Sequence, residues 1–493
     1  MGSPKICASP SWVMNPSNAG PSQASETSIH GWMRRERATA PRYRGGQARA
    51  ITRLLSDRLR QRPRRSPLNV WREITWYTTF SLVQTVTARD GYSQYTPVTS
   101  APSSATTRRI LSIDVARGVA MILMAIDHVR VYAGVPPGGP LPGVFFTRWI
   151  TNFVAPAFAF LSGTSAYLLG RKLGSTRALS RYLLTRGLVL VLLELTVIRV
   201  AWTFNFRFGE YLLAGVIWML GWCMVLMSAL VWLPVAAIGG FGIAVIFLHN
   251  VMDIVAPPSD AIAQSALGWL WQILYYGGPI QLGANGPTLA VLYSIFPWIG
   301  VMAAGYAFGA IMTLEPKRRD RICVMIGVGA VALFFLLRTL DVYGDPRHWH
   351  ATGPTPLPTF FRYINTSKYP ASLQFLLMTL GPLFLLLPLF EHARGKLGEI
   401  VATYGRVPLF YYLLHIPAIH LAAVFVSLIR EGRVDGWLFE NHPMMNPPPP
   451  PGYMWSLGLL YFVWLIVIAT LYFPSRWYWR RKSTAPARWM RFV

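Results

Sequence analysis

The chain has 493 residues, of which 53% are hydrophobic and 14% aromatic, and it carries a formal net charge of +26. A soluble globule of this composition could not cover its surface with polar side chains, so we expect a polytopic membrane protein. The Lys and Arg residues collect in the N-terminal segment, in short loops and at the C-terminus, which favours a lipid bilayer as the partner and no nucleic acid.

Residues 1–107 are rich in Arg, Ser, Pro and Thr and show no helical periodicity, so we expect a basic, disordered N-terminal extension. Its apolar stretch at 74–86 is too short to cross a bilayer. The composition resembles an organellar transit peptide, and a wrongly assigned start codon explains it equally well. We assign no catalytic residue to this extension.

Residues 108–475 contain recurring apolar runs of about twenty residues, the length that spans the hydrocarbon core. We predict an all-α membrane bundle of about ten transmembrane helices in this domain. The predicted spans are 113–133, 149–170, 183–202, 211–233, 235–256, 289–313, 322–340, 371–390, 407–429 and 453–474.

Basic residues follow the second and sixth spans and fill the C-terminal tail, residues 476–493. Under the positive-inside rule these segments lie on one side, so both termini are predicted to be cytoplasmic. The connection at Leu233 and Pro234 carries no charge, and a merged or re-entrant pair of spans is the alternative there.

Ionisable side chains share one face of the first span. Arg117 and His128 lie about 20° apart around the helix and roughly 16 Å apart along it. Such groups at membrane depth are costly and usually functional. The Arg117 guanidinium suits a phosphate group, and His128 suits a nucleophile or general base whose tautomer Asp127 or Asp114 sets. The alternatives are a snorkelling arginine, a helix cap and a satisfied buried histidine.

Further candidates lie on other spans. Tyr411 and His415 share a face of the ninth span and could meet His128 across the bundle. The predicted substrate-binding residues are Asn152, Lys368, Tyr369, Tyr411 and His415. The residues predicted to hold a phosphate-bearing acyl carrier, such as a coenzyme A thioester, are Asp114, Arg117 and Arg406. For these positions, helix packing, interfacial anchoring and topology are the structural alternatives.

Several motifs are absent from the sequence or incomplete. The three cysteines lie far apart, and His348 and His350 lack a third ligand, so we expect no metal site. No Walker glycine loop or Gly-x-Ser-x-Gly elbow occurs, which removes the usual indications of ATP-driven transport and serine hydrolysis.

The Ser162–Gly163 step in the second predicted span could allow another helix to approach closely.

Several stretches resemble the DUF1624 family, the bacterial relatives of heparan-alpha-glucosaminide N-acetyltransferase within the transmembrane acyltransferase superfamily. The first is the pair Arg117 and His128 with ten residues between them, followed by Phe-Leu-Ser-Gly at 160–163. The others are Arg-Ile-Leu-Ser-Ile-Asp at 109–114, Phe-Pro-Trp-Ile-Gly at 296–300, and the motifs within 368–381 and 405–415. Their order along residues 108–475 carries the resemblance.

The resemblance implies an integral protein of the bacterial inner (plasma) membrane that transfers acetyl groups. Cytoplasmic acetyl-CoA would be a co-substrate, with no cofactor bound permanently, and a glycan amine or hydroxyl, or another small acceptor, would accept on the outer side. Lysosomal members carry their presumed catalytic histidine in the loop after the first span and have asparagine where His128 stands. Here that loop, 134–140, has no histidine. His128, aided by Asp127, is therefore the catalytic candidate, with acyl-enzyme and direct transfer both open.

Two other functions stay open at this point. Ten helices with buried charges also suit a secondary transporter, although the sequence shows no convincing internal duplication. A non-enzymatic membrane component of envelope assembly could be built on the same fold. Nothing in the sequence indicates an oligomeric state.

Overall fold

The computed structural model describes residues 109–255, 265–350, 357–484 and 490. The predicted extension 1–107 and its expected disorder lie outside these residues. The described part is mostly helical with few strands, so the predicted all-α membrane bundle is confirmed. The bundle surrounds a single extensive hydrophobic core, to which nearly every long helix contributes.

Each of the ten predicted spans overlaps one of the main helices, although several helices begin or end outside the predicted bounds. These helices are α4 (Leu111–Tyr132), α6 (Val154–Leu173), α7 (Thr176–Leu193), α9 (Val216–Leu230), α10 (Val235–Leu248), α14 (Phe296–Ile311), α15 (Pro316–Leu340), α17 (Leu373–Glu391), α19 (Pro408–Glu431) and α20 (Leu457–Thr484). Shorter elements include α5 (Pro142–Trp149), α8 (Arg199–Thr203), α11 (Met252–Val255), α13 (Gly268–Trp271), α16 (Thr359–Ile364) and α18 (Lys396–Arg406).

Six helical segments within the described residues are long and apolar enough to cross a membrane. They are 142–173, 235–255, 316–340, 373–391, 408–431 and 457–484. The predicted count of ten spans is therefore not confirmed, because α4, α7, α9 and α14 lie outside these six segments; α9 and α14 are shorter apolar helices. Helices α9 and α10 are separate, with Pro234 at the N-cap of α10, so that pair does not merge.

A small sheet replaces the beginnings of two predicted spans. Strands β1 (Tyr211–Ala214), β2 (Gly278–Gln281) and β3 (Thr288–Val291) form a sheet of order β1-β3-β2. Strand β1 pairs parallel with β3, and β2 pairs antiparallel with β3. The predictions for the first residues of the spans 211–233 and 289–313 were wrong, since these residues belong to β1 and β3. Hydrophobicity alone does not distinguish a short buried strand from the same number of residues in a buried helix.

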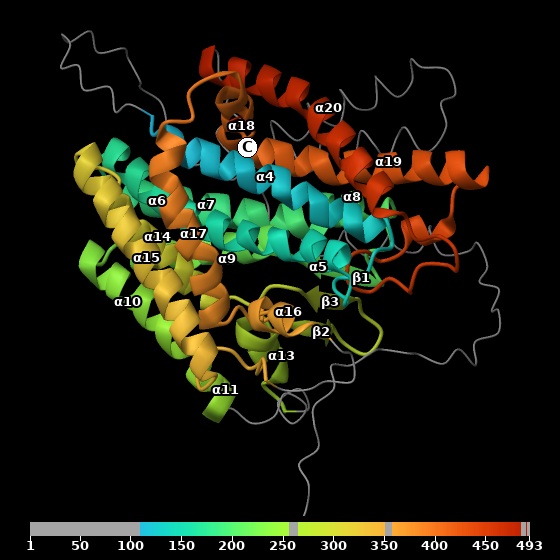
Figure 1. Cartoon of the computed structure of the whole chain (residues 1–493), viewed down its shortest axis with the longest axis horizontal. Coiled ribbons are helices and arrows are strands. Elements are labelled where there is room, and N and C mark those ends of the chain that lie inside the picture. Colours follow the sequence, from blue (N-terminus) through green and yellow to red (C-terminus); the bar gives the residue numbers. More distant parts are fainter. Residues whose placement is uncertain (1–108, 256–264, 351–356, 485–489, 491–493) are drawn as a thin grey trace, which may run out of the picture. The chain divides into compact units, whose positions relative to one another are not determined.

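Helix α4 lies within the bundle and contacts α6, α17, α18, α19 and α20, three of which run beside it in Figure 1 (α18, α19 and α20). Helix α18 approaches it closely, since a Cβ on Gly405 would lie 1.8 Å from the carbonyl oxygen of Asp114. Because other helices cover α4 on several sides, its polar side chains must find partners within the protein.

Helices α6 and α14 touch through their backbones. A Cβ on Gly163 would lie 1.9 Å from the carbonyl oxygen of Met302, and one on Gly305 would lie 2.0 Å from that of Phe160. Small residues permit this spacing, which confirms the close helix approach expected at Gly163. The neighbouring Ser162 lines the cavity described below.

The Gly305→Ala variant tests this contact. Its methyl group would force α6 and α14 apart, so we expect a stability loss of about 1–3 kcal/mol, measured as a lower thermal unfolding midpoint in detergent. The control is Gly329→Ala, because no atom lies within 4 Å of a Cβ at that position of α15. Equal losses in the two variants would contradict the packing argument.

Candidate active site

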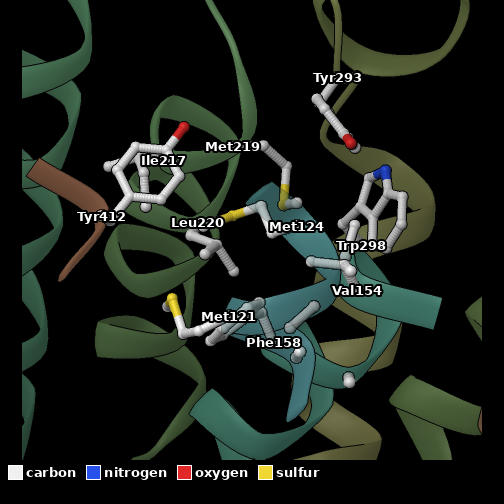
Figure 2. Close-up of a cluster of buried hydrophobic side chains, with 14 of the residues drawn as sticks. Met121, Met124, Val154, Phe158, Ile217, Met219, Leu220, Tyr293, Trp298 and Tyr412 are labelled. Atoms are coloured by element: carbon white, nitrogen blue, oxygen red, sulfur yellow. The ribbon is translucent and has the colours of Figure 1, made fainter. Parts of the chain in front are cut away.

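A cavity of about 100 Å³ lies beside α4. Its walls are apolar and come from α4, α6, α9 and α19, and Figure 2 shows many of the side chains that form them. These wall residues include Met121, Met124, Val154, Phe158, Ile217, Leu220 and Tyr412. A cavity with mostly apolar walls suits a flexible chain with little charge.

Polar residues line this cavity at two levels of α4. At one level are Arg186 of α7 and the first residues of α19, Pro408 and Leu409. At the other are Asp127, His128, Thr151, Tyr293 and Lys368. Met121 and Met124 of α4 line the cavity between these two groups of residues. The cavity therefore has a basic end and an end that carries the imidazole of His128.

The His128 imidazole contacts two aromatic neighbours. Its Nδ1 lies 2.6 Å from Nε2 of His415. The Trp202 ring packs against it in a T-shaped arrangement, with centroids 4.8 Å apart and planes 68° apart. The structure thus brings together His128 and His415, whereas Tyr411 packs against His415 with centroids 5.4 Å apart.

Asp127 takes part in an ion cluster beside His128. Its Oδ1 lies 2.8 Å from Nε of Arg130 and 3.6 Å from Nε of Arg148. The partner of the His128 ring nitrogen is therefore His415, and the carboxylate of Asp127 is occupied by two guanidinium groups. Arg148 is a site residue that the sequence reasoning missed, although its position at the start of the second predicted span was a signal.

Asn152 and Tyr369 contact Arg148. The guanidinium donates to Oδ1 of Asn152 at 3.3 Å and to the Tyr369 hydroxyl at 3.4 Å. Lys368 lines the cavity, and its Nζ lies 5.7 Å from the Tyr293 ring centroid and 5.4 Å from that of Tyr369. Burial, together with the Arg148 charge, lowers the pKa of the Lys368 ammonium.

The loop that carries Lys368 is held by Asp345. The backbone N–H of Ser367 and the hydroxyl of Ser372 each donate to Oδ2 of Asp345 at 2.8 Å. Burial raises the pKa of this carboxyl group, although the Ser367 and Arg347 N–H groups oppose the rise. These bonds fix the loop on both sides of Lys368.

The predicted coenzyme residues lie near the basic end of the cavity but do not line it. Arg117 donates to the carbonyl oxygen of Leu161 at 2.9 Å and to Oγ of Ser165 at 2.5 Å. Asp114 pairs with Arg109 at 2.5 Å and with Arg406 at 3.7 Å.

Arg406 also pairs with Glu399 on α18, which raises the pKa of Arg406 and lowers that of Glu399. The cavity-lining cation at this end is Arg186. The sequence reasoning treated it only as a topological charge, although an arginine inside a predicted span was a signal of function.

Residues 109–340 match the family model described as heparan-alpha-glucosaminide N-acetyltransferase, catalytic. The match runs from the residues before α4 to the end of α15 and includes Asp127, His128 and Arg186. It confirms the resemblance to the heparan-alpha-glucosaminide N-acetyltransferase catalytic family over these residues. No curated protein matches the chain.

The Asp127→Asn variant tests the ion cluster. It would leave Arg130 and Arg148 largely buried without their carboxylate, so we expect a stability loss of about 3 kcal/mol in thermal unfolding. The control is Glu210→Gln, whose partner Arg207 and own side chain are about half exposed, with an expected loss below about 1 kcal/mol. A wild-type midpoint for Asp127→Asn would show that the cluster does not stabilise the fold.

Proposed function

Since residues 109–340 resemble the catalytic domain of this N-acetyltransferase family, we propose that the chain is an integral membrane acyltransferase. It moves an acetyl group from cytoplasmic acyl-CoA to a glycan amine or hydroxyl on the outer side of a bacterial inner membrane, with both termini cytoplasmic. The observation that carries the proposal is the cavity that Arg186 lines at one end and His128 lines at the other.

The basic end suits the phosphates of coenzyme A. Arg186 lines the cavity there, and Arg117 and Lys482 lie near enough for their charges to interact with it. Guanidinium groups bind phosphate oxygens through paired hydrogen bonds. In this arrangement the nucleotide stays at this end, beside the cations, while the acyl-bearing arm enters between Met121 and Met124.

The His128 end suits the transfer itself. In direct transfer, the acceptor amine or hydroxyl attacks the thioester carbonyl carbon and loses its proton to His128. The carbon–sulfur bond then breaks, and the coenzyme thiolate takes up that proton. In the acyl-enzyme route, Nε2 of His128 attacks the carbonyl carbon first, and the carbon–sulfur bond breaks to release the coenzyme thiolate. The acceptor then attacks the acyl-imidazole, the carbon–nitrogen bond to His128 breaks, and the acceptor proton passes to the thiolate. Lys368 and Tyr293 line the same end and would contact the acceptor.

The His128→Ala variant tests the catalytic assignment. We expect purified protein in lipid to lose at least about 100-fold in acetyl transfer from radiolabelled acetyl-CoA, because no other group would take the proton. The control is His392→Ala, an exposed histidine at the end of α17. Full turnover in His128→Ala would defeat the assignment, and uptake of an unmodified solute would favour a transporter.

The Arg186→Gln variant tests the donor end. Losing one charge-assisted contact to phosphate should raise KM for acetyl-CoA about tenfold with little change in kcat. With an acetyl thioester of pantetheine, which lacks the nucleotide phosphates, the variant and wild type should behave alike. The control is Arg177→Gln, an exposed position on the same helix. An equal KM effect with both donors would exclude phosphate binding at Arg186.

A further inference from the structure

We infer that His415 is a positioning residue that holds His128 in the tautomer with hydrogen on Nδ1, which leaves Nε2 of His128 as the reacting nitrogen. The assignment of the tautomer rests on geometry alone. Its catalytic consequence rests on the proposed function.

Nδ1 of His415, the nitrogen that does not face His128, bonds to the backbone of its own helix. Nδ1 of His415 lies 2.7 Å from the carbonyl oxygen of Tyr412, one turn earlier on α19. A carbonyl oxygen has no hydrogen and can only accept. Nδ1 of His415 therefore carries the hydrogen and donates it.

The surroundings of His415 determine its charge. The side chain is fully buried, and no carboxylate of the described residues pairs with it. An imidazolium in that place would be an unpaired buried charge, which costs several kcal/mol. His415 is therefore neutral. Its Nε2 carries no hydrogen and accepts a hydrogen bond through its lone pair.

The nitrogen of His415 without hydrogen determines which nitrogen of His128 carries one. Since Nε2 of His415 accepts, the Nδ1 of His128 that lies 2.6 Å away must donate. The ring centroids are 4.8 Å apart and the planes differ by only 24°, as expected for nearly coplanar rings that meet edge to edge through their nitrogens. A neutral imidazole has one ring hydrogen, so Nε2 of His128 is bare.

The surroundings of His128 leave that lone pair available. Among the described residues, Nε2 of His128 has no hydrogen-bond partner, and the ring lines the cavity. Asp127 does not compete for the ring, because Arg130 and Arg148 hold its carboxylate. The Trp202 ring packs against the imidazole in a T-shaped arrangement.

The pair resembles the base and orienting group of a catalytic triad, with a neutral imidazole in place of a carboxylate. When Nε2 of His128 accepts a proton from the acceptor, both of its nitrogens carry hydrogen, and His415 continues to accept from Nδ1. The proton on Nε2 then leaves with the coenzyme thiolate. His415 neither gains nor loses a proton.

The tautomer is tested by nitrogen NMR of the full chain in lipid nanodiscs, with histidines labelled with ¹⁵N and the His128 signals assigned by comparison with His128→Ala. We expect a protonated Nδ1 and a bare Nε2. The opposite pattern in the wild-type protein would overturn the inference, whether or not the variants below fold. If this pattern is found but thioester turnover is absent, the proposed function fails while the tautomer assignment stands.

The positioning role is tested by two variants that both remove the donor to Tyr412 and differ in what faces His128. His415→Gln can place an acceptor oxygen where Nε2 stood, so kcat should fall less than about tenfold. His415→Phe offers no acceptor, so kcat should fall about 100-fold with KM for acetyl-CoA unchanged. Equal kcat losses in these variants, at equal thermal stability, would contradict the role of His415.

Discussion

The burial of α4 among other helices is the constraint on which the candidate site depends. A buried polar group without a partner costs several kcal/mol, so each ionisable side chain of this helix must be satisfied by neighbouring elements. The partners that result are specific. Arg117 bonds to α6, Asp114 pairs with Arg406 of α18, and His128 bonds to His415 of α19. The close contact of α18 with α4 at Gly405 makes one of these pairings geometrically accessible.

This pairing also separates the charges into two regions. The carboxylate of Asp127 forms ion pairs with Arg130 and Arg148. It therefore does not bond to the His128 ring, and the imidazoles of His128 and His415 bond to each other. Arg186 lines the opposite end. In the proposed function, the apolar walls between the two regions would separate phosphate binding from acid–base chemistry, as a donor with a charged head and a reactive tail requires.

Close backbone contact is what keeps the cavity narrow. Helices α6 and α14 meet at Gly163 and Gly305, and the residue next to Gly163, Ser162, faces the cavity instead of α14. A larger side chain at either glycine would move α6, whose Val154 and Phe158 form part of the wall. The dimensions of the cavity therefore depend on residues that do not line it.

The amino-acid sequence by itself determined the class of the protein: apolar runs of membrane length, a shared face for Arg117 and His128, and motifs that resemble one family. These features are local, because hydropathy and helical periodicity depend on neighbours within a few turns. It did not determine that residues 211–214 and 288–291 are strands, since their pairing joins segments far apart in the chain. Only the tertiary structure decided that Arg186 lines the cavity and that His415, 287 positions beyond His128, is the partner of its ring nitrogen. Which buried polar groups meet depends on how helices distant in sequence pack, and no periodicity within one helix contains that information.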